Sequence, residues 1–278
     1  MPSSTSSSSE SPSRFLPGPR PRRIAHRGFA LDGAENTLRA FRDALGEGAD
    51  MLETDTRSTA DGTALAFHDE TLQRVAGLDL PVAELRDKDV DTVRVAGDEP
   101  LARLDDVLDA FRHVPVNIDV KDEAAIAPAA RAIARTRAAR RICVTSFDDR
   151  VARSAVEAVR ATSGVVPMRS PSRGRITAVL AAQAVEVPDA VMRRLLRPYG
   201  ALQIPPTHRG VRILTPRLVA AAHRAGCEVH VWTIDDPSHM ADLLEMGVDG
   251  IVTNRVDLLS DLLESSEGNN PRPLSAAP

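Results

Sequence analysis

The chain of 278 residues has a formal net charge of −4, with 42% hydrophobic, 27% charged and 3% aromatic residues. These values are typical of a soluble globular protein with a sizeable core. They argue against a nucleic-acid partner, because neither a basic charge excess nor many stacking rings are present. No stretch approaches the roughly 18 apolar residues of a membrane span, so we expect no stable membrane insertion and a cytoplasmic location. Cys143 and Cys227 are too few for a zinc or disulfide framework, and the oligomeric state stays open.

Both ends of the chain are predicted to be disordered tails. Residues 1–21 are rich in Ser and Pro without the apolar run of a secretory signal, and residues 266–278 are similar. Between them, residues 22–265 alternate strand-like runs, expected for strands buried on both faces, with helix-like patterns. The expected strands are Arg23–His26, Met51–Asp55, Val116–Val120, Ile142–Thr145, Val165–Met168, Leu202–Pro205, Val229–Ile234 and Gly250–Thr253. The expected helices are Leu38–Gly46, Glu123–Ala139, Asp148–Ala161, Arg173–Glu186, Pro216–Ala225, Pro237–Met246 and Val256–Glu264.

Eight strands, mostly separated by helices, predict the α/β class and a (β/α)8 TIM barrel. The segment between Asp55 and Val116 is too long for one crossover. Asp61-Gly62 indicates a turn that places Ala64–Phe67 on a hairpin-like extension after the second strand, and residues from about 77 to 100 form a small insertion. The alternative, an open doubly wound sheet, lacks its usual phosphate loop, because no GxGxxG or GxxxxGK[ST] pattern is present.

Ionisable residues gather at the ends of the early strands. Residues i and i+2 of a strand share a face, so Glu53 and Asp55 are expected to point inward together, as are Asp119 and Lys121. The carboxyl ends of barrel strands meet at one mouth, where buried charges need partners or a metal. Three carboxylates offer hard oxygen ligands for Mg²⁺ or Ca²⁺. Each motif alone is more often a surface or salt-bridged feature, and the prediction depends on their combination with His26, Arg27 and His68.

The chain resembles the glycerophosphodiester phosphodiesterase family over about residues 23–262. The most specific motifs are His26-Arg27-Gly28, Ala34-Glu35-Asn36-Thr37-Leu38, Gly48-Ala49-Asp50-Met51-Leu52-Glu53-Thr54-Asp55, Thr59-x-Asp61-Gly62 and His68-Asp69-x-x-Leu72-x-Arg74. Weaker similarities are Asn117-Ile118-Asp119-Val120-Lys121, Thr145-Ser146-Phe147, Val231-Trp232-Thr233 and Asp249-Gly250-Ile251-Val252-Thr253.

The resemblance implies a TIM-like barrel with an insertion after the second strand. It also implies metal-dependent hydrolysis of a small-molecule glycerophosphodiester to an alcohol and glycerol 3-phosphate. By the same resemblance, His26 and His68 are catalytic, and Arg27 and Lys121 neutralise the phosphate. The implied metal ligands are Glu53, Asp55 and Asp119, with Mg²⁺ or Ca²⁺ as the cofactor. Two residues have less defined roles: Glu35 borders the site, and Trp232 either lines the glycerol side of the pocket or packs in the core.

Three positions depart from the family pattern. Asp119 stands where a Glu is usual, Asp235 where an Asn is usual, and Asn254-Arg255-Val256 replaces the usual Asp-x-Pro. These changes leave the metal preference and the substrate fit open. Two alternatives also remain: a lysophospholipase D or sphingomyelinase D-like enzyme that forms a cyclic phosphate, and a non-catalytic barrel that binds a phosphate ligand.

The other histidines are interpreted conservatively. Four of them lie on expected loops or polar helix faces and are predicted to be solvated: His113, His208, His223 and His239. His230 alternates with Trp232 on an expected strand, so it either packs in the core or faces the barrel interior.

Overall fold

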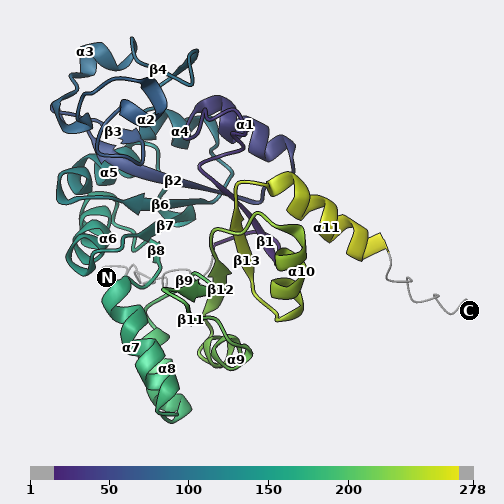
Figure 1. Ribbon diagram of the computed structural model, residues 1–278. Coiled ribbons are helices and arrows are strands. Elements are labelled where there is room, and N and C mark those ends of the chain that lie inside the picture. The colour runs from purple at the N-terminus through teal and green to yellow at the C-terminus, as the bar shows by residue number, and fades with distance from the viewer. Residues whose placement is uncertain (1–15, 269–278) are drawn as a thin grey trace, which may run out of the picture.

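Eight parallel strands form a nearly closed barrel in the computed structural model, which describes residues 16–268 (Figure 1). Helices lie between the strands on the outside, so the predicted fold is confirmed. The strands follow one another in the order β8-β7-β6-β2-β1-β13-β12-β9. Their bounds are Arg22–His26 (β1), Met51–Ser58 (β2), Val116–Val120 (β6), Ile142–Thr145 (β7), Met168–Arg169 (β8), Ala201–Ile204 (β9), Glu228–Val231 (β12) and Gly250–Thr253 (β13).

The barrel closes differently between β8 and β9. β8 and β9 form no paired ladder among the described residues; the Gly200 N–H instead donates to the Arg169 carbonyl at 3.1 Å. The Arg169 side chain also donates to the Pro198 carbonyl at 3.0 Å. β8 starts later than expected, at Met168, directly after Pro167. Proline has no N–H to give to a ladder, which explains why this strand is short.

The outer helices form where the sequence supplies caps and an apolar face. Thr37 accepts the Ala40 N–H at the start of the first helix, and Asp122 accepts the Ala125 N–H at the start of the fifth. The main helices are Leu38–Gly46 (α1), Leu104–Ala110 (α4), Glu123–Arg135 (α5), Asp149–Ser163 (α6), Arg173–Ala184 (α7), Asp189–Leu196 (α8), Pro216–Arg224 (α9), Pro237–Glu245 (α10) and Val256–Gly268 (α11).

The excess residues after β2 form a small lobe, at the upper left of Figure 1. Its first strand, Ala64–Ala66 (β3), pairs antiparallel with β2, as the expected hairpin required. The rest consists of Gln73–Ala76 (α2), Val82–Glu84 (η1), Asp87–Val90 (α3), Arg94–Val95 (β4) and Glu99–Pro100 (β5). The lobe has an apolar core of its own, which includes Leu65, Leu72 and Leu85. A second small hairpin, Thr207–His208 (β10) with Val211–Arg212 (β11), follows β9.

Ordered structure extends slightly past both expected tail boundaries. Leu16 is buried, and Arg22 donates to the Leu16 and Pro17 carbonyls, so residues 16–21 pack against the barrel. Helix α11 continues to Gly268. The expected tails otherwise fall on residues 1–15 and 269–278, outside the described residues.

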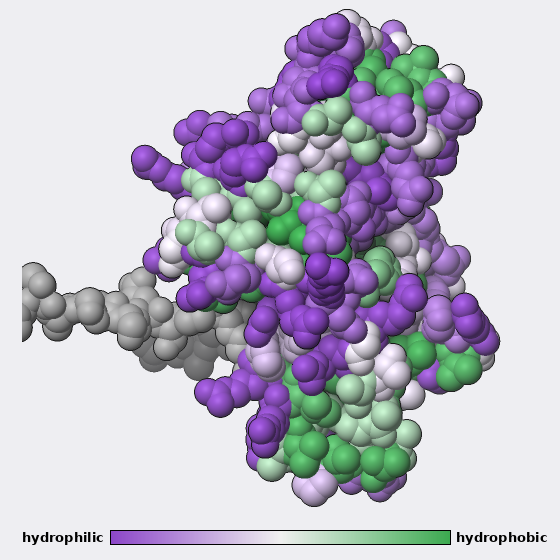
Figure 2. All heavy atoms as spheres, turned by 90° about the vertical axis from the view of Figure 1, so that its left-hand side faces the viewer, coloured by the Kyte–Doolittle hydropathy of each residue, from purple (hydrophilic) through white to green (hydrophobic). Residues whose placement is uncertain are grey.

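The described surface is mostly polar. Figure 2 shows one face that is largely hydrophilic, with an apolar area at its lower end, at the height where α7 and α8 project in Figure 1. Among residues 16–268, no helix is both long and apolar enough to cross a membrane.

Candidate active site

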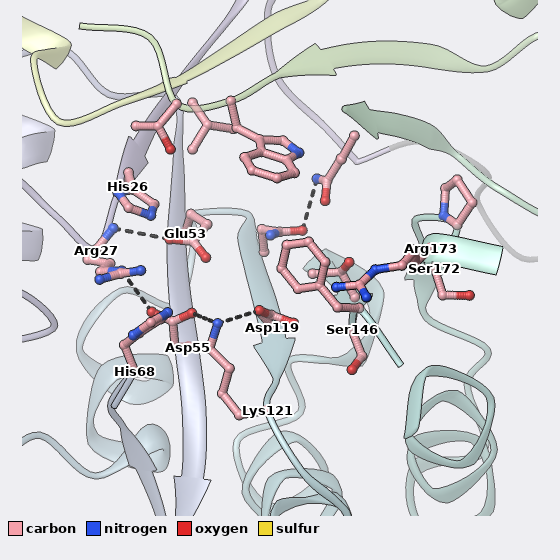
Figure 3. Close-up of a pocket in the computed structure, with 18 of the residues that line it drawn as sticks. His26, Arg27, Glu53, Asp55, His68, Asp119, Lys121, Ser146, Ser172 and Arg173 are labelled. Atoms are coloured by element: carbon pink, nitrogen blue, oxygen red, sulfur yellow. Dashed lines mark hydrogen bonds and ion pairs between the residues drawn. The ribbon is translucent and has the colours of Figure 1, made fainter. Parts of the chain in front are cut away.

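The carboxyl ends of the strands surround a cavity of about 270 Å³ (Figure 3). Every site residue predicted from the sequence lines this cavity except Glu35, which instead contacts the lining residue Arg27. The residues brought together are His26, Arg27, Glu53, Asp55, His68, Asp119, Lys121 and Trp232. The position of active sites at this end of barrel strands is general for the fold.

The turn after β1 depends on a close backbone approach. Gly28 has a φ of +87°, and a Cβ at this position would lie 2.7 Å from the Ala40 carbonyl carbon. The Phe29 N–H then donates to the Ala40 carbonyl at 2.8 Å, which fixes the turn against α1. Arg27, with a φ of +58°, is thereby held at the cavity beside β2.

Two cations and three carboxylates form the buried centre of the cavity. The register of β2 and β6 places Asp55 beside Asp119. The Lys121 ammonium lies 2.6 Å from an oxygen of each, and the Arg27 Nε lies 2.9 Å from Asp55. Burial opposes ionisation of Asp55, but Lys121 and Arg27 outweigh it and lower its pKa.

The other two carboxylates are not fully neutralised. Glu53 accepts the Arg27 backbone N–H at 3.2 Å, and burial together with the nearby Asp55 charge raises its pKa well above the usual value. Burial also raises the pKa of Asp119, whose buried Oδ1 has no hydrogen-bond partner. The buried centre of the cavity holds three carboxylates and two cations, so ionisation of all three carboxylates would leave an excess of negative charge there, which is costly to bury.

This donor set fits a hard divalent cation, although the side chains are not gathered around an ion. Within residues 16–268, no group of three or more His, Cys, Asp or Glu side chains is arranged to hold a metal. Lys121 instead bridges Asp55 and Asp119. The unpartnered Asp119 Oδ1 and the raised pKa of Glu53 indicate where a further positive charge is favoured.

His26 is held by an amide. Its Nδ1 lies 2.8 Å from the Asn254 Oδ1, while the Asn254 Nδ2 and backbone N–H both donate to the Asp235 carboxylate at 2.8 Å. Since a carboxylate only accepts, the amide nitrogen must face Asp235, and the His26 Nδ1 must carry a hydrogen. Burial and the nearby Arg27 charge lower the pKa of His26. The neutral imidazole therefore has its lone pair on Nε2.

His68 is held by a carboxylate. Its Nδ1 lies 2.6 Å from Asp69 Oδ1, and Arg74 donates to the other Asp69 oxygen at 2.6 Å. Burial works against ionisation of Asp69, but the hydrogen bonds from Arg74 and His68 hold its pKa at about 2. Glu35 accepts from both Arg27 and Arg74, so it links the two histidine-bearing turns without lining the cavity.

Several lining residues were missed in the sequence. Asn117 shares the inward face with Asp119, so the i and i+2 rule that placed Asp119 also applies to it. Gln203 is a polar residue in an apolar strand and donates to Asn117 at 3.0 Å. Phe147 packs edge-to-face on Trp232, with ring centroids 5.7 Å apart. Arg173 is the first residue of α7, and no motif indicates it.

His230 and both cysteines are buried in the protein. The His230 Nε2 is 2.8 Å from Glu228, and its Nδ1 is 3.5 Å from the Gln203 amide nitrogen. Glu228 in turn accepts two hydrogen bonds from Arg22. Cys143 and Cys227 are buried free thiols, as the low cysteine count indicated.

A barrel mouth with paired histidines, carboxylates and cations defines an enzyme that acts on phosphate esters. A model of the glycerophosphoryl diester phosphodiesterase family matches residues 26–258. The chain belongs to this family, and it is an enzyme that hydrolyses glycerophosphodiesters. Enzymes of the family generally depend on a divalent metal.

One relative supports this assignment, and two solved structures share the fold. The chain is 37% identical over 241 residues to "Probable glycerophosphodiester phosphodiesterase 2" of Mycobacterium tuberculosis, which covers 86% of this chain and 89% of that protein. Among solved structures, it is similar to a glycerophosphodiester phosphodiesterase from Agrobacterium tumefaciens, with a TM-score of 0.68, 24% identity and coverage of 87% and 98%. A phosphodiesterase from Oleispira antarctica, solved with the product sn-glycerol-3-phosphate, has a TM-score of 0.68, 19% identity and coverage of 87% and 96%.

Proposed function

We propose that this enzyme hydrolyses glycerophosphodiesters to an alcohol and glycerol 3-phosphate with a divalent metal and two catalytic histidines. The observation that carries the proposal is that His26 and His68 line the same cavity as three buried carboxylates, beside which Arg27 and Lys121 lie as ion-pair partners. Glu53, Asp55 and Asp119 would hold the metal, and Mg²⁺ or Ca²⁺ suits their oxygen atoms. The bound ion would supply positive charge to the phosphoryl oxygens.

Arg27 and Lys121 prepare the cavity for an anion. A phosphodiester is already negatively charged, and its transition state redistributes that charge over the phosphoryl oxygens. Both cations lie beside the carboxylates, and the buried Arg27 Nε has no hydrogen-bond partner among the described residues, so both can bind a phosphate. Glu35 holds the Arg27 guanidinium at 3.0 Å and acts as a positioning residue.

The two histidines differ in a way that suits different proton transfers. His26 has a lowered pKa and, when neutral, a free Nε2 lone pair, so it suits the general base. His68, unlike His26, is oriented by a carboxylate on its Nδ1, so we assign it as the general acid that protonates the leaving alkoxide. In this scheme, His26 takes the proton from the neighbouring glycerol hydroxyl as that hydroxyl attacks phosphorus, and His68 gives a proton to the departing alkoxide. Water then opens the cyclic phosphate to glycerol 3-phosphate.

Glycerol 3-phosphate release from glycerophosphoglycerol tests the assignment. After chelation, we expect activity to be lost and restored by one of Mg²⁺, Ca²⁺ or Mn²⁺. His26→Ala and His68→Ala should each lower kcat by about 10² or more. His113→Ala is the control, because His113 is exposed on the loop before β6. Near-normal turnover in either active-site variant, or full activity with no metal, would refute the proposal.

The separate roles of the histidines are tested with an activated leaving group. The 4-nitrophenyl diester of glycerol phosphate has a leaving group that needs little protonation. His68→Ala should therefore lose much less activity on this diester than on glycerophosphoglycerol, whereas His26→Ala should lose similar activity on both. The opposite pattern would exchange the two roles.

The cyclic-phosphate alternative is separated by its product. Phosphorus NMR of the reaction with lysophosphatidylcholine and glycerophosphocholine distinguishes a released cyclic phosphate from a linear monoester. We expect the linear monoester glycerol 3-phosphate to accumulate from glycerophosphocholine. The non-catalytic alternative is not supported, because the chain belongs to an enzyme family and keeps both histidines and all three carboxylates at one cavity.

A further inference from the structure

The wall of the cavity opposite His26 has a different charge from the catalytic side. It consists of the segments after β7 and β8, which contribute Ser146, Phe147, Ser172 and Arg173 (Figure 3). The carboxylates that line the cavity all come from β2 and β6 on the other side. Among the described residues, this opposite wall therefore presents one cation and no anion.

Arg173 differs from the other lining cations in having no carboxylate partner. Arg27 and Lys121 each form ion pairs, whereas no ion pair or side-chain hydrogen bond is found for Arg173 within residues 16–268. Its side chain is exposed and points from the start of α7 into the cavity (Figure 3). An unpaired guanidinium keeps all its donors available for a ligand.

The backbone that carries Arg173 is fixed by its neighbours. The Arg173 N–H donates to the Phe147 carbonyl at 3.3 Å, and the Ser172 hydroxyl donates to Asp149 at the start of α6. A Cβ at Gly174 would collide with the same Asp149 carboxylate. Asp149, the nearest carboxylate along these contacts, is thus bonded to Ser172 and is not paired with Arg173.

The position of Arg173 determines which half of the substrate it can meet. The reacting phosphate belongs beside His26, His68 and the carboxylates. The constant glycerol half is small and can enter the closed floor, where Asn117 and Gln203 offer polar atoms. The variable alcohol must then leave toward the open rim, where Phe147 is 53% exposed and Arg173 is exposed beside it.

We propose that Arg173 is a specificity-determining residue that favours glycerophosphodiesters whose alcohol carries an anionic group, a phosphate or a carboxylate, over those with a cationic choline. This proposal rests on the hydrolytic function proposed above. The guanidinium forms forked hydrogen bonds with either anion, and it repels a quaternary ammonium at the same place. The exposed Phe147 ring contacts the carbon atoms between the phosphate and the anionic group.

The test compares kcat/KM for four diesters of glycerol phosphate: with inositol 4-phosphate, serine, glycerol and choline. The wild type should prefer the inositol phosphate and serine diesters. Arg173→Gln should lower kcat/KM for these two by about tenfold, which corresponds to one lost charge-assisted contact, and should leave the glycerol diester nearly unchanged. Arg173→Lys should keep part of the preference. Arg175→Gln is the matched control, since Arg175 is exposed on the same turn but does not line the cavity.

Three results would overturn the proposal: a wild-type preference for choline, an equal loss on all four diesters in Arg173→Gln, or the same loss in Arg175→Gln. Failure of the underlying function looks different. If the wild type turns over no diester with any metal, the proposed function itself is wrong. If it turns over the glycerol diester normally without an Arg173-dependent preference, only the specificity role is wrong.

Discussion

At the scale of single residues, two departures from the family pattern compensate for each other. Asp235 stands where Asn is usual and Asn254 where Asp is usual, and the two side chains are hydrogen-bonded at 2.8 Å. One amide and one carboxylate are thus retained, with their positions exchanged. As a result, the neutral Asn254 amide contacts His26, and the charged Asp235 carboxylate contacts Asn254 instead of His26. What looked like two separate losses in the sequence is one rearranged contact.

This contact predicts a reciprocal effect of substitutions. Asn254→Asp alone places two carboxylates in contact, and one must be protonated or displaced. We expect kcat/KM to fall by about tenfold or more, because His26 loses its fixed orientation. The double variant Asn254→Asp with Asp235→Asn restores one amide and one carboxylate, and should recover most of the activity. A double-mutant cycle measures this coupling; if the double variant is as impaired as the single one, the exchanged contact does not orient His26.

Asp69 is predicted to orient His68. Asp69→Asn keeps the size of the side chain but replaces a charged acceptor, 2.6 Å from the His68 Nδ1, with an amide. We expect kcat to fall about tenfold or more with little change in KM, because the imidazole loses the charged acceptor that orients it. Since the pKa of Asp69 is about 2, its carboxylate stays ionised at ordinary assay pH, and the difference between variant and wild type should persist from pH 5 to 9.

The matched control is Glu70→Gln, an exposed neighbour whose side chain has no part in this contact. Equal losses in Glu70→Gln and Asp69→Asn would show a general effect of charge on the lobe. An Asp69→Asn enzyme with normal kcat would show that His68 needs no carboxylate.

At the scale of elements, the accuracy of sequence reasoning depended on local signals. Helix α1 was predicted to the residue from its apolar stripe and the Gly at its end, and the structure adds the cap at Thr37. Helix α8 was missed, because Asp189–Leu196 follows α7 closely and was interpreted as part of one long connection to the next strand. The carboxylates of β2 and β6 were predicted to face the cavity, because side chains alternate between the two faces of a strand. Arg173 could not be predicted, because its position depends on how the loop after β8 folds over the mouth.

The start of β12 contains a buried ion pair that should control acid stability. Glu228 accepts two hydrogen bonds from Arg22, at 2.8 and 3.0 Å, and one from His230. Burial opposes its ionisation, but His230 and Arg22 outweigh that effect and lower its pKa from 4.5 to about 2. Because the pKa in the folded state is depressed, the stabilisation is present above about pH 4.5 and is lost as the pH falls toward 2. Its size is on the order of 3 kcal/mol.

Glu228→Gln is predicted to destabilise the barrel by roughly 3 kcal/mol or more at pH 7, because Arg22 is left as an uncompensated buried charge. Urea unfolding at several pH values measures this. The difference from the wild type should shrink as the pH falls below about 4.5, because the unfolded wild-type chain takes up a proton at Glu228 there while the folded protein does so only near pH 2. Glu245→Gln on the surface of α10 is the control and should cost little. A constant difference from pH 7 to pH 3 would contradict the assigned pKa.

At the scale of the whole molecule, the barrel is less tightly joined between β8 and β9 than elsewhere. β2 and β6 pair over five successive positions, from Leu52 with Val116 to Thr56 with Val120. Between β8 and β9, the Gly200 N–H bond to Arg169 replaces a ladder. The cavity extends across this junction, since Ser172 lines it from one side and Gln203 from the other. Substrate binding and closure of the barrel should therefore be coupled.

Hydrogen exchange tests the coupling. Backbone amides in 168–172 and 199–202 should exchange faster than those of β2 and β6, because they have fewer ladder hydrogen bonds to protect them. Saturating glycerol 3-phosphate should slow exchange at this junction, because a ligand that contacts both sides favours the closed arrangement. Residues 94–100, in the β4–β5 hairpin of the distant lobe, are the control and should not change. If the junction is already as protected as β2 without ligand, the barrel is fully closed in solution and ligand binding does not close it.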